Sequence, residues 1–204
     1  MIKKVCILFA SPRKNGNTKQ LVIPFVDELD KAGVSSRLLD LYDMKIEGCH
    51  ACRTCQNIWD GFGCPIDDDV HVIFDEILES DLFVLATPIY SWFCTMPMKG
   101  VIDRLVYGMN KYFGDERGPS LWKGKELAII STCGYRVEIG MENFADAMKK
   151  YCKHSGLKYK GSLAERDMGY NARFMNEEKE IHARDFAREM INNSHQIHTK
   201  FISK

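Results

Sequence analysis

Residues 10–20, with the sequence ASPRKNGNTKQ, carry side chains suited to binding an anion, and they directly follow an apolar run. Two hydroxyl groups, a guanidinium fork and a glycine that permits close backbone approach lie near one another in the sequence. The helical pattern that follows points its first N–H groups at the same place. This predicts a phosphate-binding loop formed by Ser11, Arg13, Asn15, Gly16, Asn17 and Thr18. In isolation, the stretch is also typical of a turn with a helix N-cap.

The phosphate-binding loop lacks the known nucleotide fingerprints. Neither G-x-G-x-x-G nor G-x-x-x-x-G-K-[ST] occurs between the apolar run and the helical pattern. The loop therefore suits a dianionic phosphate rather than a dinucleotide or a nucleoside triphosphate.

Two later segments also follow apolar runs and suit a flat ligand. Residues 87–93, TPIYSWF, are mostly aromatic and apolar, so they can flank a planar ring or cover a subunit interface. Residues 132–136, TCGYR, contain Gly134, which permits close approach to a ligand. A phosphate at one end and a flat ring at the other describe flavin mononucleotide, FMN.

A cysteine-rich stretch, CHACRTCQNIWDGFGCP, suggests a second kind of chemistry. Its candidate metal ligands are Cys49, Cys52, Cys55 and Cys64. Bacterial ferredoxins use a similar C-x2-C-x2-C run and a Cys-Pro partner for a cubane cluster, whereas zinc sites more often use two separate C-x-x-C turns. The pattern favours a [4Fe-4S] cluster, with free or reversibly oxidised thiols and zinc as the alternatives.

The remaining cysteines and two charged features have structural interpretations. We expect Cys6 and Cys152 in the core, whereas Cys94 and Cys133 fall in the candidate ring-binding loops. The acidic run Asp67, Asp68 and Asp69 precedes a helical pattern, so helix capping explains it. Asp103 and Arg104 are expected in a structural ion pair or an interface contact.

Strand-like and helix-like patterns alternate along the whole chain. The expected strands are 3–9, 34–42, 81–88, 125–133 and 157–166, and the expected helices are 18–33, 70–80, 98–113, 141–156 and 176–193. This alternation predicts an α/β fold with a doubly wound parallel sheet and helices on both faces. Ligands bind such sheets beyond the carboxyl ends of the strands, so loops 10–18, 87–94 and 132–138 should meet there.

Length and composition limit the possible classes of protein. With 204 residues, 45% of them hydrophobic, the chain suits one domain over residues 1–204 with a cysteine-rich insertion at about 43–67. The formal net charge is zero and the basic residues are scattered, which argues against a nucleic-acid partner. The N-terminal apolar run is too short for a signal or membrane segment, so we expect a cytoplasmic protein without a membrane partner. In a reducing cytosol, the eight cysteines favour metal or redox chemistry over disulfides.

Four ordered motifs carry a family resemblance. SPRKNGNT, the cysteine run followed by DDD, ATPIYSW and MKGVIDRL resemble the NADPH-dependent FMN reductase family of flavodoxin-like proteins, and more narrowly its iron-sulfur flavoprotein branch. The likeness extends from residue 1 to about 136 and implies a five-stranded sheet of order 2-1-3-4-5. The eight residues between Cys55 and Cys64 depart from the shorter interval usual in that branch.

The resemblance also implies where the flavin binds. Its phosphate would be held by Ser11, Arg13, Asn17 and Thr18. Its ring would lie against Pro88, Ile89, Tyr90 and Ser91, next to Trp92, and against Thr132, Cys133, Gly134 and Tyr135. Members of the family are commonly homodimers or homotetramers with flavin sites near the interface.

Three functions are compatible with these features. The first is an FMN-dependent oxidoreductase that passes electrons from NAD(P)H to a small acceptor such as a quinone or a flavin. It needs no catalytic acid or base, because the cofactor carries the chemistry. The second is an electron carrier with FMN and [4Fe-4S] that is fed by ferredoxin. The third is a flavin-binding module whose cysteines form only a thiol or zinc staple.

Overall fold

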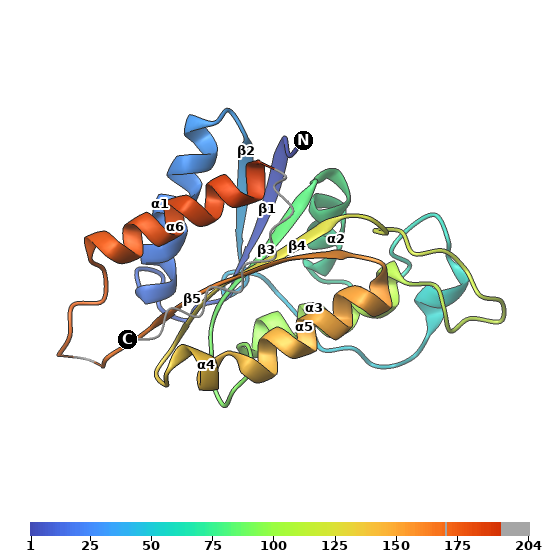
Figure 1. Ribbon diagram of the computed structural model, residues 1–204. Coiled ribbons are helices and arrows are strands. Elements are labelled where there is room, and N and C mark those ends of the chain that lie inside the picture. Colours follow the sequence, from blue (N-terminus) through green and yellow to red (C-terminus); the bar gives the residue numbers. More distant parts are fainter. Residues whose placement is uncertain (170, 193–204) are drawn as a thin grey trace.

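The computed structural model describes residues 1–169 and 171–192, and these form a doubly wound α/β fold (Figure 1). The five strands are β1 (Lys4–Phe9), β2 (Ser35–Asp40), β3 (Leu82–Pro88), β4 (Glu126–Cys133) and β5 (Lys158–Arg166). All neighbouring strands are parallel and the sheet order is β2-β1-β3-β4-β5. The predicted strands and the predicted strand order are both confirmed.

Helices and strands alternate along the chain in the predicted order. The helices are α1 (Asn17–Lys31), η1 (Thr54–Asn57, a 3-10 helix), α2 (Val70–Glu79), α3 (Met96–Met109), α4 (Val137–Gly140), α5 (Glu142–Ser155) and α6 (Glu177–Ile191). The short helices η1 and α4 were not expected. Asn193, the last residue of the expected 176–193 helix, lies outside the described residues. None of the helices in the described part combines the length and apolar character that crossing a membrane requires.

The third helix ends earlier than its hydrophobic pattern predicts. It was expected to reach residue 113 but stops at Met109, and Asn110 forms an isolated antiparallel bridge with Ser120. The Asn110 side chain accepts hydrogen bonds from Ser120 and from the Trp122 indole, both at 2.9 Å. These buried bonds draw the chain out of the helix, an effect that periodicity alone does not reveal.

Two hydrophobic cores lie on opposite faces of the sheet. Along β1, Val5, Ile7 and Phe9 pack with α1 and α6, whereas Cys6 and Leu8 pack with α2, α3 and α5. Figure 1 shows the same division of the helices between the two faces. Burial on both faces explains why the strands are continuous apolar runs rather than alternating ones.

Candidate functional site

The phosphate loop, residues 10–18, joins β1 to α1 at the carboxyl end of the sheet. The Ser11 hydroxyl is buried, where it accepts a bond from the Arg13 amide at 3.3 Å and donates to the Arg13 carbonyl at 3.1 Å. The first bond of the following helix runs from the Gln20 amide to the Gly16 carbonyl, at 3.1 Å. The amides of residues 17–19 precede that bond, and the first turn contains no acidic residue, so this helix end favours an anion.

Gly16 has a packing role within the loop itself. A Cβ atom there would lie 2.9 Å from the Arg13 Cβ and 3.0 Å from the Arg13 carbonyl oxygen. Its φ of −75° is ordinary for any residue. The glycine therefore allows the loop to fold tightly on itself, and this brings Arg13 over the helix end.

Arg13 has an acidic neighbour that the sequence analysis missed. Its side chain is 54% exposed, and its Nη2 lies 3.9 Å from Asp167 Oδ2. Asp167 directly follows β5, and its amide donates to the Cys133 carbonyl at 2.8 Å. The sequence could have predicted the position of Asp167. It directly follows the expected fifth strand, and the carboxyl ends of parallel strands lie at one edge of the sheet.

The first and third loops meet through a buried contact. Thr18 and Thr132 place their hydroxyl oxygens 2.9 Å apart, and both residues are buried. Asn15 is exposed and Asn17 is half-buried beside them. The structure therefore brings residues of two predicted loops together at the carboxyl ends of β1 and β4.

The second loop contains a strained turn. The amides of Tyr90 and Phe93 each donate to the other residue's carbonyl, at 2.9 and 3.0 Å. Between them, Ser91 and Trp92 have φ values of 49° and 60°. Consecutive left-handed residues define a type I′ turn, which glycine and asparagine normally occupy. Such strain is concentrated at functional sites, and here it exposes the rings of Tyr90 and Trp92.

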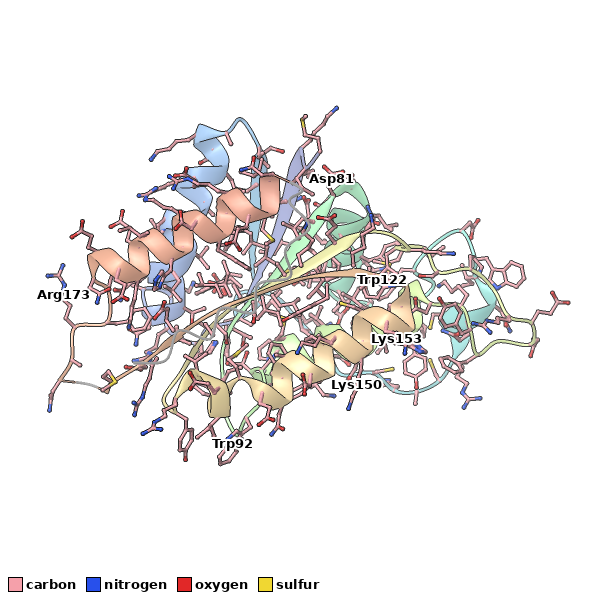
Figure 2. All side chains as sticks on the ribbon, viewed as in Figure 1. Asp81, Trp92, Trp122, Lys150, Lys153 and Arg173 are labelled. Atoms are coloured by element: carbon pink, nitrogen blue, oxygen red, sulfur yellow. The ribbon has the colours of Figure 1, made fainter. Side chains whose placement is uncertain are left out.

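The second and third loops also meet. The Trp92 and Tyr135 rings stack with centroids 5.4 Å apart and an interplanar angle of 18°. Below them, the Ile89 amide donates to the Thr132 carbonyl at 2.8 Å. Figure 2 shows Trp92 at the outer rim of the molecule. At Gly134, an added Cβ would meet no atom within 4 Å, so the surface there is open.

The two cysteines of these loops turn away from the open surface. Burial raises the pKa of Cys94 to about 12 and that of Cys133 to about 11. The Cys133 thiol donates to the Tyr135 carbonyl at 3.4 Å, and a Cβ on Gly140 would lie 2.8 Å from its sulfur. The thiols are therefore held neutral, and Cys133 offers its backbone to this edge of the sheet rather than its sulfur.

A separate cavity of about 270 Å³ lies between β5 and α6. Val137, Leu163 and Phe186 contribute apolar surface to it, and none of the predicted flavin-binding residues lines it. His182 Nδ1 lies 2.8 Å from Glu165 Oε1 in the same wall. The cavity neighbours the candidate site but is distinct from it.

The cysteine segment, residues 43–67, contains the four candidate metal ligands at different depths. Cys49 and Cys52 are exposed, Cys64 is half-buried and Cys55 is buried. Among residues 1–169 and 171–192, no three His, Cys, Asp or Glu side chains form a group that could hold a metal ion. Burial raises the pKa of Cys55, and the nearby Cys64 and Cys49 add to this effect.

Each of the four sulfurs accepts a hydrogen bond. The donors to Cys49 and Cys52 are the Ala51 amide and the Thr54 hydroxyl, each at 3.4 Å. The donors to the other two sulfurs are the Gln56 amide group, 3.6 Å from Cys55, and the Arg104 guanidinium, 3.3 Å from Cys64. The four sulfurs thus each bond to a separate donor, and the described part of the chain does not bring three of them together as a metal site.

Asp68 does not act mainly as the expected helix cap. The N-cap residue of α2 is Asp69, and its side chain makes no capping bond, although Asp68 Oδ1 accepts from the Val70 amide at 3.2 Å. Asp68 instead forms a fully buried ion pair with Arg104. Burial is the largest influence on the pKa of Asp68 and would raise it, but the hydrogen bonds from Arg104, Glu47 and Val70, together with the Arg104 charge, outweigh burial and lower the pKa. The ion pair expected for Arg104 is confirmed.

The family profile described as NADPH-dependent FMN reductase matches residues 3–156 of this chain. The chain belongs to the NADPH-dependent FMN reductase family. This confirms the resemblance read from the four motifs, and the family implies FMN as the bound group. An anion-binding helix end, Arg13 and an open surface at Gly134 fit the phosphate and the ring of that cofactor.

Individual relatives agree with this assignment. Over 101 residues the chain is 32% identical to an iron-sulfur flavoprotein of Methanocaldococcus jannaschii, covering 50% of this chain and 51% of the relative. An iron-sulfur flavoprotein of Archaeoglobus fulgidus is 32% identical over 121 residues, covering 59% of this chain and 53% of the relative. The chain thus aligns with about half the length of these curated relatives.

A solved structure supports the fold over a greater length. An NAD(P)H:quinone oxidoreductase from Methanothermobacter marburgensis has a TM-score of 0.74, with 96% of this chain and 100% of that chain covered. The identity is 19%, so this likeness establishes the shared architecture alone.

Proposed function

We propose that the protein is an FMN-dependent oxidoreductase that passes electrons from NAD(P)H to a small acceptor such as a quinone or a flavin. The observation that carries the proposal is the helix end at residues 17–19, which has Arg13 above it and no acidic residue in its first turn. Placed at the carboxyl edge of a doubly wound sheet, it suits a dianionic phosphate. Family membership supports the same cofactor.

Each group of residues has a distinct task in this proposal. Arg13 and the amides at the start of α1 bind the phosphate, with Ser11, Asn15, Asn17 and Thr18 supplying polar side chains around it. The turn at residues 88–92 and the loop at residues 132–135 orient the ring and exclude water from it. When bound, FMN supplies hydride and single-electron transfer. Backbone N–H groups near Gly134 would stabilise negative charge on a bound ring, so no catalytic acid or base is required.

NAD(P)H binds without a dinucleotide fingerprint in this proposal. The exposed Trp92 and Tyr135 rings border the open surface at Gly134 that is proposed for the flavin ring, so a nicotinamide or another flat molecule would stack over the outer face of that ring. A planar acceptor and the nicotinamide would use the same face in turn.

The decisive experiment compares FMN with riboflavin, which lacks the phosphate. We expect Arg13→Ala to weaken FMN binding about 10- to 100-fold, since a charge-assisted hydrogen bond contributes about 1.5–3 kcal/mol. Riboflavin binding should be unchanged. Flavin fluorescence titration of the full chain measures both affinities. Lys14→Ala is the matched control, because Lys14 is the adjacent exposed cation and pairs with Asp43 at 2.6 Å. Unchanged FMN affinity in Arg13→Ala would contradict the proposal.

A second candidate function is electron transfer between FMN and a [4Fe-4S] cluster, with ferredoxin as the donor. The C-x2-C-x2-C run with its Cys-Pro partner supports it, as does the similarity to iron-sulfur flavoproteins. In Figure 1 the cyan helix of the cysteine segment lies on the right and α4, which follows the 132–136 loop, lies at the lower left, so an electron route would have to join these two parts of the chain. A homodimer or homotetramer that brings one subunit's cysteines near another subunit's flavin would shorten it.

Chemical analysis separates the two functions. Anaerobically purified protein should contain FMN in either case, but iron and sulfide only in the second. Rapid bleaching of the flavin by NAD(P)H supports the first function, and bleaching by reduced ferredoxin alone supports the second. A cytoplasmic location belongs to both proposals, because reduced thiols and clusters persist in a reducing compartment.

A further inference from the structure

Asp167 is fixed at the carboxyl end of β5 by backbone contacts. Its amide donates to the Cys133 carbonyl at 2.8 Å, which continues the pairing of β5 with β4. Its carboxylate oxygen Oδ1 accepts from the Gly169 amide at 3.0 Å. Gly169 has a φ of 103°, a conformation that favours glycine, so the residue type at 169 permits this turn. The position of the Asp167 carboxylate therefore does not depend on Arg13.

The other carboxylate oxygen of Asp167 faces the phosphate loop. Asp167 Oδ2 lies 3.9 Å from Arg13 Nη2, and the two side chains are 29% and 54% exposed. This separation is longer than an N–H···O hydrogen bond, which measures about 2.7–3.2 Å. The contact is therefore one between opposite charges, without a hydrogen bond.

The guanidinium of Arg13 keeps all its donors available. Among residues 1–169 and 171–192, no atom accepts a hydrogen bond from it, and Asp167 is the one carboxylate that pairs with it. Lys14, the adjacent cation, already pairs with Asp43 at 2.6 Å. Arg13 is thus the cation of this loop that a phosphate at the start of α1 can use.

A carboxylate beside Arg13 has two conceivable roles. Either it orients the guanidinium toward the phosphate, or it competes with the phosphate for the guanidinium. Orienting an arginine fork requires charge-assisted hydrogen bonds of about 2.7–2.9 Å, and the 3.9 Å contact does not supply them. A negative charge at that distance still offsets the charge of Arg13, because Coulomb attraction needs no hydrogen bond. The geometry therefore favours competition.

We propose that Asp167 is a specificity-determining residue of the flavin site, which competes with the FMN phosphate for Arg13. It limits how much more tightly FMN binds than a flavin without a phosphate, so that bound FMN exchanges more readily with the solution. Such exchange suits a protein whose acceptor is a free flavin. The inference rests on the proposed function, because it requires a phosphate at Arg13.

The test compares Asp167→Asn with the wild type in the full chain, by flavin fluorescence titration in low-salt buffer. Asparagine keeps an oxygen for the Gly169 amide but removes the negative charge. We expect FMN affinity to rise about two- to fivefold, which is the scale of a partly exposed charge contact, and riboflavin affinity to stay unchanged. Because salt screens such contacts, the gain should disappear at about 1 M salt. A merely structural role of Asp167 would lower the affinity instead.

Asp185→Asn is the matched control, because it removes the same charge from an ion pair elsewhere. Asp185 pairs with Arg188 at 3.0 Å, and Arg188 also pairs with Glu28 at 2.7 Å, in the C-terminal half of α1. FMN affinity should be unchanged in this variant. Asp167→Ala removes the carboxylate together with its bond to Gly169, and it provides the same measurement if Asp167→Asn does not fold.

A double variant separates competition for Arg13 from direct repulsion of the phosphate. Without Arg13 the carboxylate has no cation to compete for, so adding Asp167→Asn to Arg13→Ala should leave FMN affinity nearly unchanged. Two residues that act through their mutual contact show this kind of non-additivity.

Three results would overturn the proposal. They are an FMN affinity that is unchanged or lower in Asp167→Asn, an equal gain for riboflavin, and the full gain in the Arg13→Ala background. Arg13→Ala alone distinguishes this failure from that of the proposed function. If Arg13→Ala binds FMN more weakly but Asp167→Asn gains nothing, only the inference about Asp167 fails. If Arg13→Ala binds FMN like the wild type, the proposed function fails as well.

Discussion

Two regions of the molecule are held together by different interactions. One is the edge of the sheet formed by loops 10–18, 87–94 and 132–138, where the flavin is proposed to bind (the flavin edge), and the other is the cysteine segment. At the flavin edge, backbone hydrogen bonds continue the sheet, from the Ala10 amide to the Ala86 carbonyl and from Ile89 to Thr132, both at 2.8 Å. In the cysteine segment, buried side chains hold the backbone instead, with Lys111 alone binding three carbonyls. The edge therefore inherits its shape from regular elements, whereas the segment depends on a few polar side chains. Single substitutions should cost far more stability in the segment.

Arg104→Ala is the strongest test of whether buried polar side chains stabilise the cysteine segment. It leaves Asp68 buried without its partner, so we expect the free energy of unfolding to fall by about 3–5 kcal/mol. Lys99→Ala on the same helix is the control. Lys99 pairs with Asp103 at 2.6 Å on the exposed surface, and the loss there should be about 0.3–0.5 kcal/mol. Urea unfolding followed by circular dichroism measures both, and equal losses would remove the contrast between buried and exposed pairs.

Gly134→Val tests whether a substitution at the flavin edge can reduce FMN binding without reducing stability. A Cβ at this position meets no protein atom within 4 Å, so stability should be unchanged within about 0.5 kcal/mol. FMN affinity should nevertheless fall by at least about tenfold, because the new side chain occupies the surface proposed for the ring. Thermal unfolding and fluorescence titration measure the two quantities. Gly140→Val provides the contrast, since its Cβ would lie 2.8 Å from the Cys133 sulfur and the variant should be destabilised.

The fold was predictable because its strands are buried on both faces. Continuous apolar runs such as Leu82–Pro88 mark such strands clearly, and their alternation with helical patterns fixes the fold class. The strand order came from the family resemblance rather than from periodicity. The positions of the phosphate and ring loops followed from the rule that parallel strands end at one edge.

Long-range polar contacts were not predictable from the sequence. The sequence analysis assigned Asp68 to a helix cap, but its main partner is Arg104, 36 residues away. Nothing in the local pattern showed that Lys111 would leave its helix and turn inward, because that depends on Asn110 bonding to Ser120 and Trp122. Asp167 was missed because the expected fifth strand was not followed to its carboxyl end.

The buried pair of Asp68 and Arg104 should make the free energy of unfolding depend on pH in acid. The pKa of this carboxyl is lowered in the folded chain, so the unfolded chain binds its proton first as the pH falls. The stabilisation is present above the unfolded value of about 3.8 and is lost as the pH falls through the lower folded value. The slope is at most about 1.4 kcal/mol per pH unit for one group. The free energy of unfolding of Asp68→Asn should depend less on pH in this window than that of the wild type.

The smallest expected effects come from the left-handed residues that both regions contain. Ser91, in the flavin-edge turn, has a φ of 49°, and Arg53, in the cysteine segment, has a φ of 59°. A left-handed residue costs about 1–2 kcal/mol, and glycine avoids that cost but loses about 0.5–1 kcal/mol in entropy. Ser91→Gly and Arg53→Gly should therefore each stabilise the fold by about 0.5 kcal/mol, measured by thermal unfolding.

Ligand binding should separate these two glycine variants. Glycine at position 91 loosens the turn that presents Tyr90 and Trp92, so we expect a few-fold loss of FMN affinity from the greater entropy of ordering. Arg53→Gly lies away from that edge and should leave FMN affinity unchanged. If both variants bound FMN like the wild type, the strain at Ser91 would belong to the fold alone. If Ser91→Gly alone weakened binding, the left-handed conformation of Ser91 would contribute to FMN binding.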